Sequence, residues 1–208
     1  MKPSKLVMFD YDGVIVDSLE VFCESYIGAC QDNGLYGIKT QKDVLTLFEN
    51  NVYAALQQQG VPLSIIDKIL EDYERRQSKH LLGLHLFANM ADALRAISKK
   101  NKVFIITSNI SAATESVMRK HGVACFEEII GAEKEKSKIR KIEKIRARFP
   151  GLPAFYVGDT KGDMMEGKAA GTTAVGVTWG WHSREQLAAG GADFIVWSPQ
   201  ELVALLLR

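Results

Sequence analysis

Short apolar runs alternate with amphipathic segments along most of the chain. The first run, Leu6–Phe9, has the length of a strand that is buried on both faces. After a long helical stretch, similar runs recur and are separated by segments with helical periodicity. They lie at residues 103–107, 128–131, 154–158, 173–177 and 193–196. Buried strands that alternate with helices predict an α/β fold with a doubly wound parallel sheet.

The stretch that follows the first run has a different pattern. Apolar stripes at helical spacing begin near Leu19, Val44 and Ile66, and no strand-like run interrupts them. Turn signals such as Asn33-Gly34 separate the stripes. We therefore expect a small α-helical bundle inserted into the α/β fold. The predicted domains are a core of residues 1–16 and 87–208 and a helical cap of residues 17–86.

Polar side chains gather at the carboxyl ends of the predicted strands, which is where doubly wound sheets bind their ligands. They are Asp10 and Asp12 after the first strand, Thr107, Ser108 and Asn109 after the second, and Asp159 and Asp163 after the fourth. Residues i and i+2 of a strand project to the same side, so two carboxylates would lie close together after the first strand.

The Asp-Tyr-Asp-Gly segment at residues 10–13 has two interpretations when it is taken alone. It is equally typical of a turn, in which Asp caps backbone amides and Gly supplies a positive φ, and of a metal site. The other carboxylates expected at the same edge favour the metal site. Mg²⁺ prefers oxygen ligands and binds one or two carboxylates together with substrate phosphates, so we predict Mg²⁺ as the cofactor.

Composition and charge narrow the class of partner. The chain has 208 residues, with 26 Lys and Arg against 25 Asp and Glu, a net charge of +1. This balance gives no overall field that would attract nucleic acid or an anionic membrane. The three cysteines have no metal-like spacing and indicate free thiols in a reducing compartment, and no apolar run is long enough for a membrane span. We expect a cytoplasmic protein that binds neither nucleic acid nor membrane.

Three segments resemble motifs of the haloacid dehalogenase (HAD) superfamily of phosphotransferases. Asp10-Tyr-Asp12-Gly13 is similar to the first motif, Thr107-Ser-Asn109 to the second, and Gly158-Asp159-Thr-Lys-Gly-Asp163-Met164 to the fourth. Residues 170–181 and 191–195 resemble phosphoglycolate phosphatase-type sequences in particular. The resemblance covers nearly the whole chain and implies a Rossmann-like core with a helical cap inserted after the first motif.

The resemblance also implies a role for each motif residue. Asp10 would be the nucleophile that forms an aspartyl-phosphate, and Asp12 the general acid and base. Mg²⁺ would be held by Asp10, the backbone carbonyl of Asp12, Asp159 and Asp163. Thr107 is expected to take part in catalysis. The substrate-binding residues would be Thr107, Ser108, Asn109 and Gly13.

The resemblance further requires a lysine that offsets the negative charge of the carboxylates and the phosphoryl group. Lys134, Lys136 and Lys138 are available, but the proline that usually follows this lysine is absent. The spacing to the apolar face of the next helix favours Lys136, and a related spacing favours Lys138. We predict Lys136 as the catalytic lysine, with Lys138 as the alternative.

The function that we expect is a Mg²⁺-dependent phosphatase acting on a small phosphorylated metabolite, such as a phosphoglycolate-like monoester. Two alternatives are a sugar phosphomutase of the same superfamily and a non-catalytic phosphate-binding or regulatory module. Tyr11 could contact the substrate or pack against the cap. The basic cluster that contains Arg75, Arg76 and Lys79 is either a substrate contact or a solvated helix face.

Overall fold

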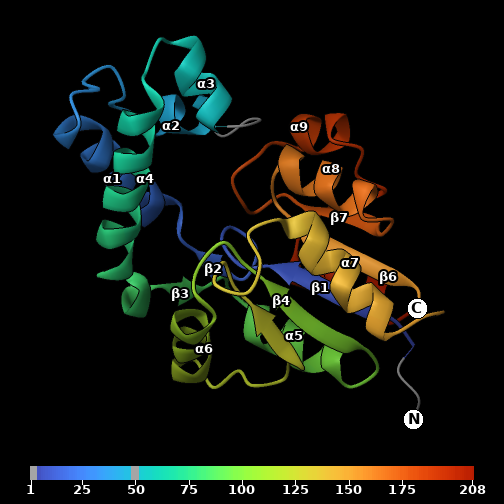
Figure 1. Cartoon of the computed structure of the whole chain (residues 1–208). Coiled ribbons are helices and arrows are strands. Elements are labelled where there is room, and N and C mark those ends of the chain that lie inside the picture. The colour runs from blue at the N-terminus through green and yellow to red at the C-terminus, as the bar shows by residue number, and fades with distance from the viewer. Residues whose placement is uncertain (1–3, 48–51) are drawn as a thin grey trace. The chain divides into compact units, whose positions relative to one another are not determined.

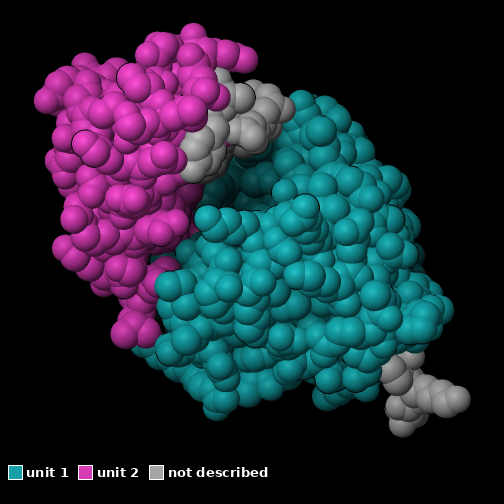
Figure 2. Space-filling model, viewed as in Figure 1, with its two compact units in different colours: residues 1–17, 84–208 teal, residues 18–83 magenta. Residues whose placement is uncertain are grey.

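A computed structural model describes residues 4–47 and 52–208 of the chain. The chain divides into two compact units (Figure 2). One contains residues 1–17 and 84–208, and the other contains residues 18–83. Both chain termini therefore belong to the larger unit, and the smaller one is an insertion in it.

A six-stranded parallel sheet forms the centre of the larger unit (Figure 1). Its strand order is β5-β4-β1-β6-β7-β8. The strands are β1 (Leu6–Asp10), β4 (Lys102–Ile106), β5 (Glu128–Ile130), β6 (Ala154–Gly158), β7 (Thr173–Val177) and β8 (Phe194–Val196). Every residue of β1 is buried, as its continuous apolar run predicts for a central strand. The predicted doubly wound α/β fold is confirmed.

Helices cover both faces of the sheet, as right-handed crossovers between parallel strands require. They are α5 (Met90–Ser98), α6 (Ser111–Lys120), α7 (Lys138–Arg148), α8 (Lys161–Ala169), α9 (Arg184–Ala189) and α10 (Pro199–Leu206). Helix α8 packs beside α7 and α9, whereas α5 packs beside α10. Ile142 and Ile145 of α7 are fully buried in a core cluster with Leu6 and Met8 of β1.

The strand register explains why the polar residues meet at one edge. Asp10 pairs with Ile106 of β4, and Phe9 pairs with Val157 of β6. The carboxyl ends of these three strands are therefore level, and the residues that follow them converge.

Every regular element among the described residues of the smaller unit is a helix. The helices are α1 (Leu19–Asp32), α2 (Gln41–Leu47), α3 (Val52–Gln58), α4 (Leu63–Ser78) and the 3₁₀ helix η1 (Leu81–Gly83). Helices α1 and α4 pack against each other, and Phe22 and Tyr26 of α1 contact the ring of Tyr73. Arg75 pairs with Asp72 and Arg76 with Asp32, so two members of the basic cluster form ion pairs within this unit.

A short antiparallel pair lies where the chain leaves the larger unit and returns to it. Strand β2 (Val16–Asp17) pairs with β3 (His85–Leu86). None of the described helices is both long and apolar enough to cross a membrane.

Candidate active site

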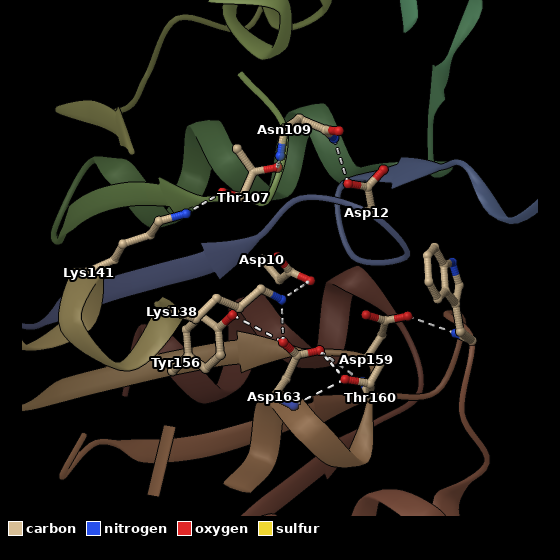
Figure 3. Close-up of polar contacts among 11 residues, drawn as sticks. Asp10, Asp12, Thr107, Asn109, Lys138, Lys141, Tyr156, Asp159, Thr160 and Asp163 are labelled. Atoms are coloured by element: carbon tan, nitrogen blue, oxygen red, sulfur yellow. Dashed lines mark hydrogen bonds and ion pairs between the residues drawn. The ribbon is translucent and has the colours of Figure 1, made fainter. Parts of the chain in front are cut away.

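Three buried carboxylates meet at the carboxyl edge of the sheet (Figure 3). Asp10 ends β1, Asp159 follows β6, and Asp163 lies in the first turn of α8. Each offers an oxygen that lies within 4.8 Å of those of the other two. The structure thus brings together three of the four carboxylates that the sequence suggested, from two neighbouring strands and one helix.

The first turn of α8 fixes Asp163 in this cluster. Thr160 is the N-cap, and its Oγ1 accepts a hydrogen bond from the Asp163 amide at 3.1 Å. In return, Asp163 Oδ2 accepts hydrogen bonds from the Thr160 amide at 3.1 Å and the Thr160 hydroxyl at 2.6 Å. This capping box and the hydroxyl of Tyr156, 3.2 Å from Asp163 Oδ1, leave the carboxylate little freedom to turn.

Two glycines allow the backbone to approach Asp159 closely. A Cβ on Gly13, whose φ is +73°, would lie 2.0 Å from Asp159 Oδ2. A Cβ on Gly180 would lie 2.3 Å from Asp159 Cβ and 2.5 Å from the carbonyl oxygen of Gly13. Gly13 was predicted to bind substrate, and the observed geometry gives it the separate role of making room for Asp159.

Lys138 is the lysine that contacts the carboxylates. Its Nζ lies 3.1 Å from Asp10 Oδ2 and 2.8 Å from Asp163 Oδ1, and its side chain is only 17% exposed. Lys136, the residue chosen from the sequence, lies on the exposed turn before α7. The structure therefore places Lys138, the alternative, beside the carboxylates, and not Lys136 as expected from the sequence. The physical reason is that α7 begins at residue 138, which directs this side chain toward the sheet edge.

Burial and mutual repulsion dominate the electrostatics of the cluster. Burial raises the pKa of Asp10 to about 8, where the charges of Asp163 and Asp12 add to the rise and Lys138 opposes it. Burial and the charges of Asp163 and Asp10 also raise the pKa of Asp159. Burial would raise the pKa of Asp163 too, but Lys138 and the hydrogen bonds from Thr160 hold it below its usual range. One lysine thus compensates the three carboxylates incompletely.

The oxygen atoms of the cluster suit a hard divalent cation. The amide of Trp181 donates a 2.8 Å hydrogen bond to Asp159 Oδ2. The other oxygen, Oδ1, is buried, and no described residue forms a hydrogen bond with it. Buried carboxylate oxygens normally have partners, so an unpartnered one beside Asp10 and Asp163 fits a metal ligand. An all-oxygen set of this kind is the one that Mg²⁺ prefers.

Asp12 is half-buried, and a residue that follows the neighbouring strand β4 forms a hydrogen bond with its side chain. Its Oδ2 accepts a 2.7 Å hydrogen bond from Asn109 Nδ2 (Figure 3). Sequence reasoning assigned Asn109 to the substrate, whereas the structure shows it bound to the predicted general acid. The side chain of Tyr11, between the two aspartates, is fully buried.

Thr107 is buried at the end of β4 and is fixed by three hydrogen bonds. Its amide donates to Ile130 O at 3.2 Å, and its Oγ1 accepts from the Asn109 amide at 2.9 Å. Its carbonyl accepts from Lys141 Nζ at 2.6 Å. Sequence reasoning missed Lys141, although its spacing of three residues from Lys138 puts both on one face of a helix. Ser108, which follows, is exposed.

The loop after β7 also contacts the site, which residue types alone did not reveal. Besides the amide of Trp181, the indole Nε1 of Trp179 donates a 3.1 Å hydrogen bond to Val14 O. Val14 belongs to the tight loop that follows Asp12, in which the Gly13 amide donates to Val16 O at 3.0 Å. The loop after β7 thereby holds the first motif and Asp159 together.

Comparison with known proteins gives a consistent result. The model of the family described as haloacid dehalogenase-like hydrolase matches residues 7–177. A phosphoglycolate phosphatase from Synechococcus elongatus is 27% identical over 201 residues, which cover 95% of this chain and 94% of that protein. The pyrophosphatase PpaX from Anoxybacillus flavithermus is 25% identical, with coverage of 96% and 95%.

Solved structures share the fold. A haloacid dehalogenase-like hydrolase family protein from Streptococcus pneumoniae superposes with a TM-score of 0.82 at 21% identity, and 97% of each chain is covered. A predicted phosphatase from Clostridium acetobutylicum gives a TM-score of 0.83 at 18% identity, with 99% of each chain covered. The similarity extends over both compact units of the chain.

Proposed function

The chain belongs to the haloacid dehalogenase-like hydrolases, and on that premise we propose that it is a Mg²⁺-dependent phosphatase acting on a small phosphate monoester. The observation that carries this proposal is the buried cluster of Asp10, Asp159 and Asp163 with Lys138 beside it. Asp12, two residues after Asp10, is held separately by Asn109. These residues would supply a nucleophile, a metal site and an acid at one sheet edge.

In the first half of the proposed reaction, an oxygen of Asp10 attacks phosphorus and forms an aspartyl-phosphate. The bond between phosphorus and the ester oxygen breaks as the new bond forms. Asp12 donates its proton to the departing oxygen, which leaves as an alcohol. The hydrogen bond from Asn109 keeps the Asp12 carboxyl in a fixed orientation during this transfer.

In the second half, a water molecule attacks the phosphorus of the aspartyl-phosphate. Asp12, now ionised, takes the proton of that water, and the bond to Asp10 breaks. Inorganic phosphate is released and both carboxyl groups return to their starting states. Two displacements on one phosphorus thus replace a single, more difficult one.

The surrounding residues would balance charge and orient the phosphoryl group. Asp10, the Asp12 carbonyl, Asp159 and Asp163 would hold Mg²⁺, which supplies positive charge to the phosphoryl oxygens when bound. Lys138 adds a second positive charge next to Asp10. The hydroxyl of buried Thr107 and the backbone amides after it would donate hydrogen bonds to the oxygens of the phosphoryl group that is transferred.

A phosphoglycolate-like substrate is proposed because several relatives are named phosphoglycolate phosphatase. Other relatives are named pyrophosphatase, so pyrophosphate belongs in the same panel of substrates. Cys23, Cys30 and Cys125 are free thiols, which supports a reducing location such as the cytoplasm.

The test is phosphate release from p-nitrophenyl phosphate, phosphoglycolate, pyrophosphate and other phosphorylated metabolites, with Mg²⁺ or with EDTA. We expect activity that EDTA and Asp10→Asn each abolish. As a matched control, Asp92→Asn changes an exposed carboxylate and should leave activity unchanged. Full activity in Asp10→Asn would contradict the nucleophile assignment. Isomerisation of a sugar phosphate without phosphate release would favour the mutase, and phosphate binding without turnover a non-catalytic module.

A further inference from the structure

Lys141 is a buried lysine without a role in the reaction proposed above. It lies on α7, one turn after Lys138, and its side chain is fully buried. Its Nζ reaches the end of β4 and donates a 2.6 Å hydrogen bond to the carbonyl oxygen of Thr107 (Figure 3). A charged side chain is rarely buried unless it has a specific partner, so this contact needs an explanation.

An apolar residue would fit this position with less cost to stability. Ile145, four residues later on the same face of α7, is buried and apolar, as is the adjacent Ile142. Burial and the nearby charge of Lys138 lower the pKa of Lys141 to about 8, which shows that the folded protein disfavours this charge. Residues that reduce stability in this way are expected mainly at functional sites.

The contact between Lys141 and the Thr107 carbonyl also fixes the direction of the next backbone amide, because both groups belong to one rigid peptide unit. The Thr107 carbonyl belongs to the same peptide unit as the Ser108 amide. The described residues contain no cis peptide, and in a planar trans unit the C=O and N–H groups point in opposite directions. A carbonyl held toward α7 by Lys141 therefore holds the Ser108 N–H away from α7. Ser108 is an exposed residue, and none of the backbone hydrogen bonds among the described residues uses its amide as donor.

We propose that Lys141 is a positioning residue that fixes the Thr107–Ser108 peptide so that the Ser108 N–H is presented to a phosphoryl oxygen. Lys141 does not itself touch the substrate; it acts through the carbonyl of Thr107. The inference rests on the proposed function, because a phosphatase substrate would provide the phosphoryl group that the Ser108 amide binds. A preorganised backbone donor stabilises developing negative charge without rearranging during the reaction.

The first experiment compares Lys141→Met with Lys144→Met in the full-length chain. Lys144 lies one turn further along α7, is 63% exposed and pairs with Glu135, so it is a matched control. Removing one preorganised donor to an oxyanion typically costs about 100-fold in kcat, and losing only its orientation should cost at least about tenfold. We expect this loss in Lys141→Met and unchanged kinetics in Lys144→Met. Lys141→Arg, which keeps a donor, should restore part of the activity.

The second experiment measures the NMR signal of the Ser108 amide directly. Orthovanadate with Mg²⁺, a mimic of the transferring phosphoryl group, should shift the Ser108 amide resonance in a ¹⁵N-labelled sample. The shift should occur in the wild type and in Lys144→Met, and be lost or much reduced in Lys141→Met. A residue that served packing alone would not change this signal in a folded variant.

The outcomes separate this inference from the proposed function. An active wild type with equal activity and an equal Ser108 shift in Lys141→Met would overturn the role of Lys141 alone. A wild type that hydrolyses no ester but shows the Lys141-dependent shift would refute hydrolysis and support the inference. No activity and no shift in the wild type would overturn both. If Lys141→Met does not fold, Lys141→Arg is compared with the shorter Lys141→Gln, and equal activity in these two would overturn the inference.

Discussion

The side-chain amide of Asn109 donates a 2.7 Å hydrogen bond to Oδ2 of Asp12. The two residues follow neighbouring strands, β4 and β1, and the parallel register of those strands brings them together. Asp12 is the proposed general acid, so its carboxyl must face the departing oxygen. A neutral donor on one carboxylate oxygen fixes that orientation without adding charge to the site.

Replacing Asn109 by Ala should therefore impair proton transfer more than substrate binding. One hydrogen bond contributes about 1 kcal/mol, which corresponds to a loss of about fivefold to tenfold in kcat. The loss should be larger for an alkyl phosphate, whose leaving group needs a proton, than for p-nitrophenyl phosphate, whose leaving group does not. Steady-state kinetics with both esters measure this difference. An equal loss for both, accompanied by a higher KM, would indicate that Asn109 binds the phosphoryl group instead.

Replacing Lys138 by Met should abolish activity and destabilise the protein. The substitution leaves Asp10 and Asp163 buried without their cation, and breaking a buried ion pair by removing one partner costs about 3–5 kcal/mol. Added Mg²⁺ should recover part of the lost thermal stability, since it would supply charge to the same carboxylates. Thermal unfolding with and without Mg²⁺ measures this. Lys136→Met, at an exposed position, is the matched control, and a greater loss of activity in Lys136→Met would favour Lys136 as the catalytic lysine.

The carboxylates of the site could be predicted from the sequence because they follow strands that are easily recognised. Asp10 and Asp159 come directly after apolar runs, and the carboxyl ends of parallel strands share one edge. The lysine could not be chosen in the same way. Ser137 caps α7, with its hydroxyl accepting from the Arg140 amide at 3.3 Å, so the helix begins at Lys138. A shift of two residues in this boundary decides which lysine faces the site, and such boundaries are weakly encoded.

Contacts made by the backbone were hidden from sequence reasoning for a different reason. The Trp181 amide binds Asp159, and the Thr107 carbonyl binds Lys141. Every residue except proline carries the same amide and carbonyl groups, so residue type does not reveal which of them are used. The role of Gly180 was hidden in a similar way, because it depends on the lack of a side chain that would otherwise meet Asp159.

Replacing Gly180 by Ala should lower the activity of the enzyme and weaken its use of Mg²⁺. The added methyl would lie 2.3 Å from Asp159 Cβ and 2.5 Å from the Gly13 carbonyl, so the backbone or Asp159 must move. Displacing a proposed metal ligand should raise the Mg²⁺ concentration needed for activity as well as lower kcat. Kinetics at increasing Mg²⁺ concentration test this. Gly37→Ala is the control, because nothing lies within 4 Å of its added methyl. Normal Mg²⁺ dependence in Gly180→Ala would show that the loop accommodates the methyl without moving Asp159.

The buried charge of Lys141 should make stability depend on pH in a defined direction. Burial lowers its pKa from 10.5 to about 8, so between these values the folded protein binds fewer protons than the unfolded chain. The free energy of unfolding should therefore rise with pH across this interval, relative to a variant without the group. This lowering of the pKa corresponds to a change of about 3 kcal/mol at most in the free energy of unfolding.

Lys141→Met provides that reference, because titrating groups far from residue 141 are common to both proteins and cancel in the difference. Below about pH 8 the wild type carries the full cost of the buried ammonium, and by about pH 10 much of that cost is relieved. Urea unfolding of both proteins at about pH 7 and at about pH 10 measures the change in their difference. We expect the wild type to gain stability relative to Lys141→Met as the pH rises. A constant difference would mean that Lys141 titrates normally, and that the Thr107 carbonyl fully compensates its burial.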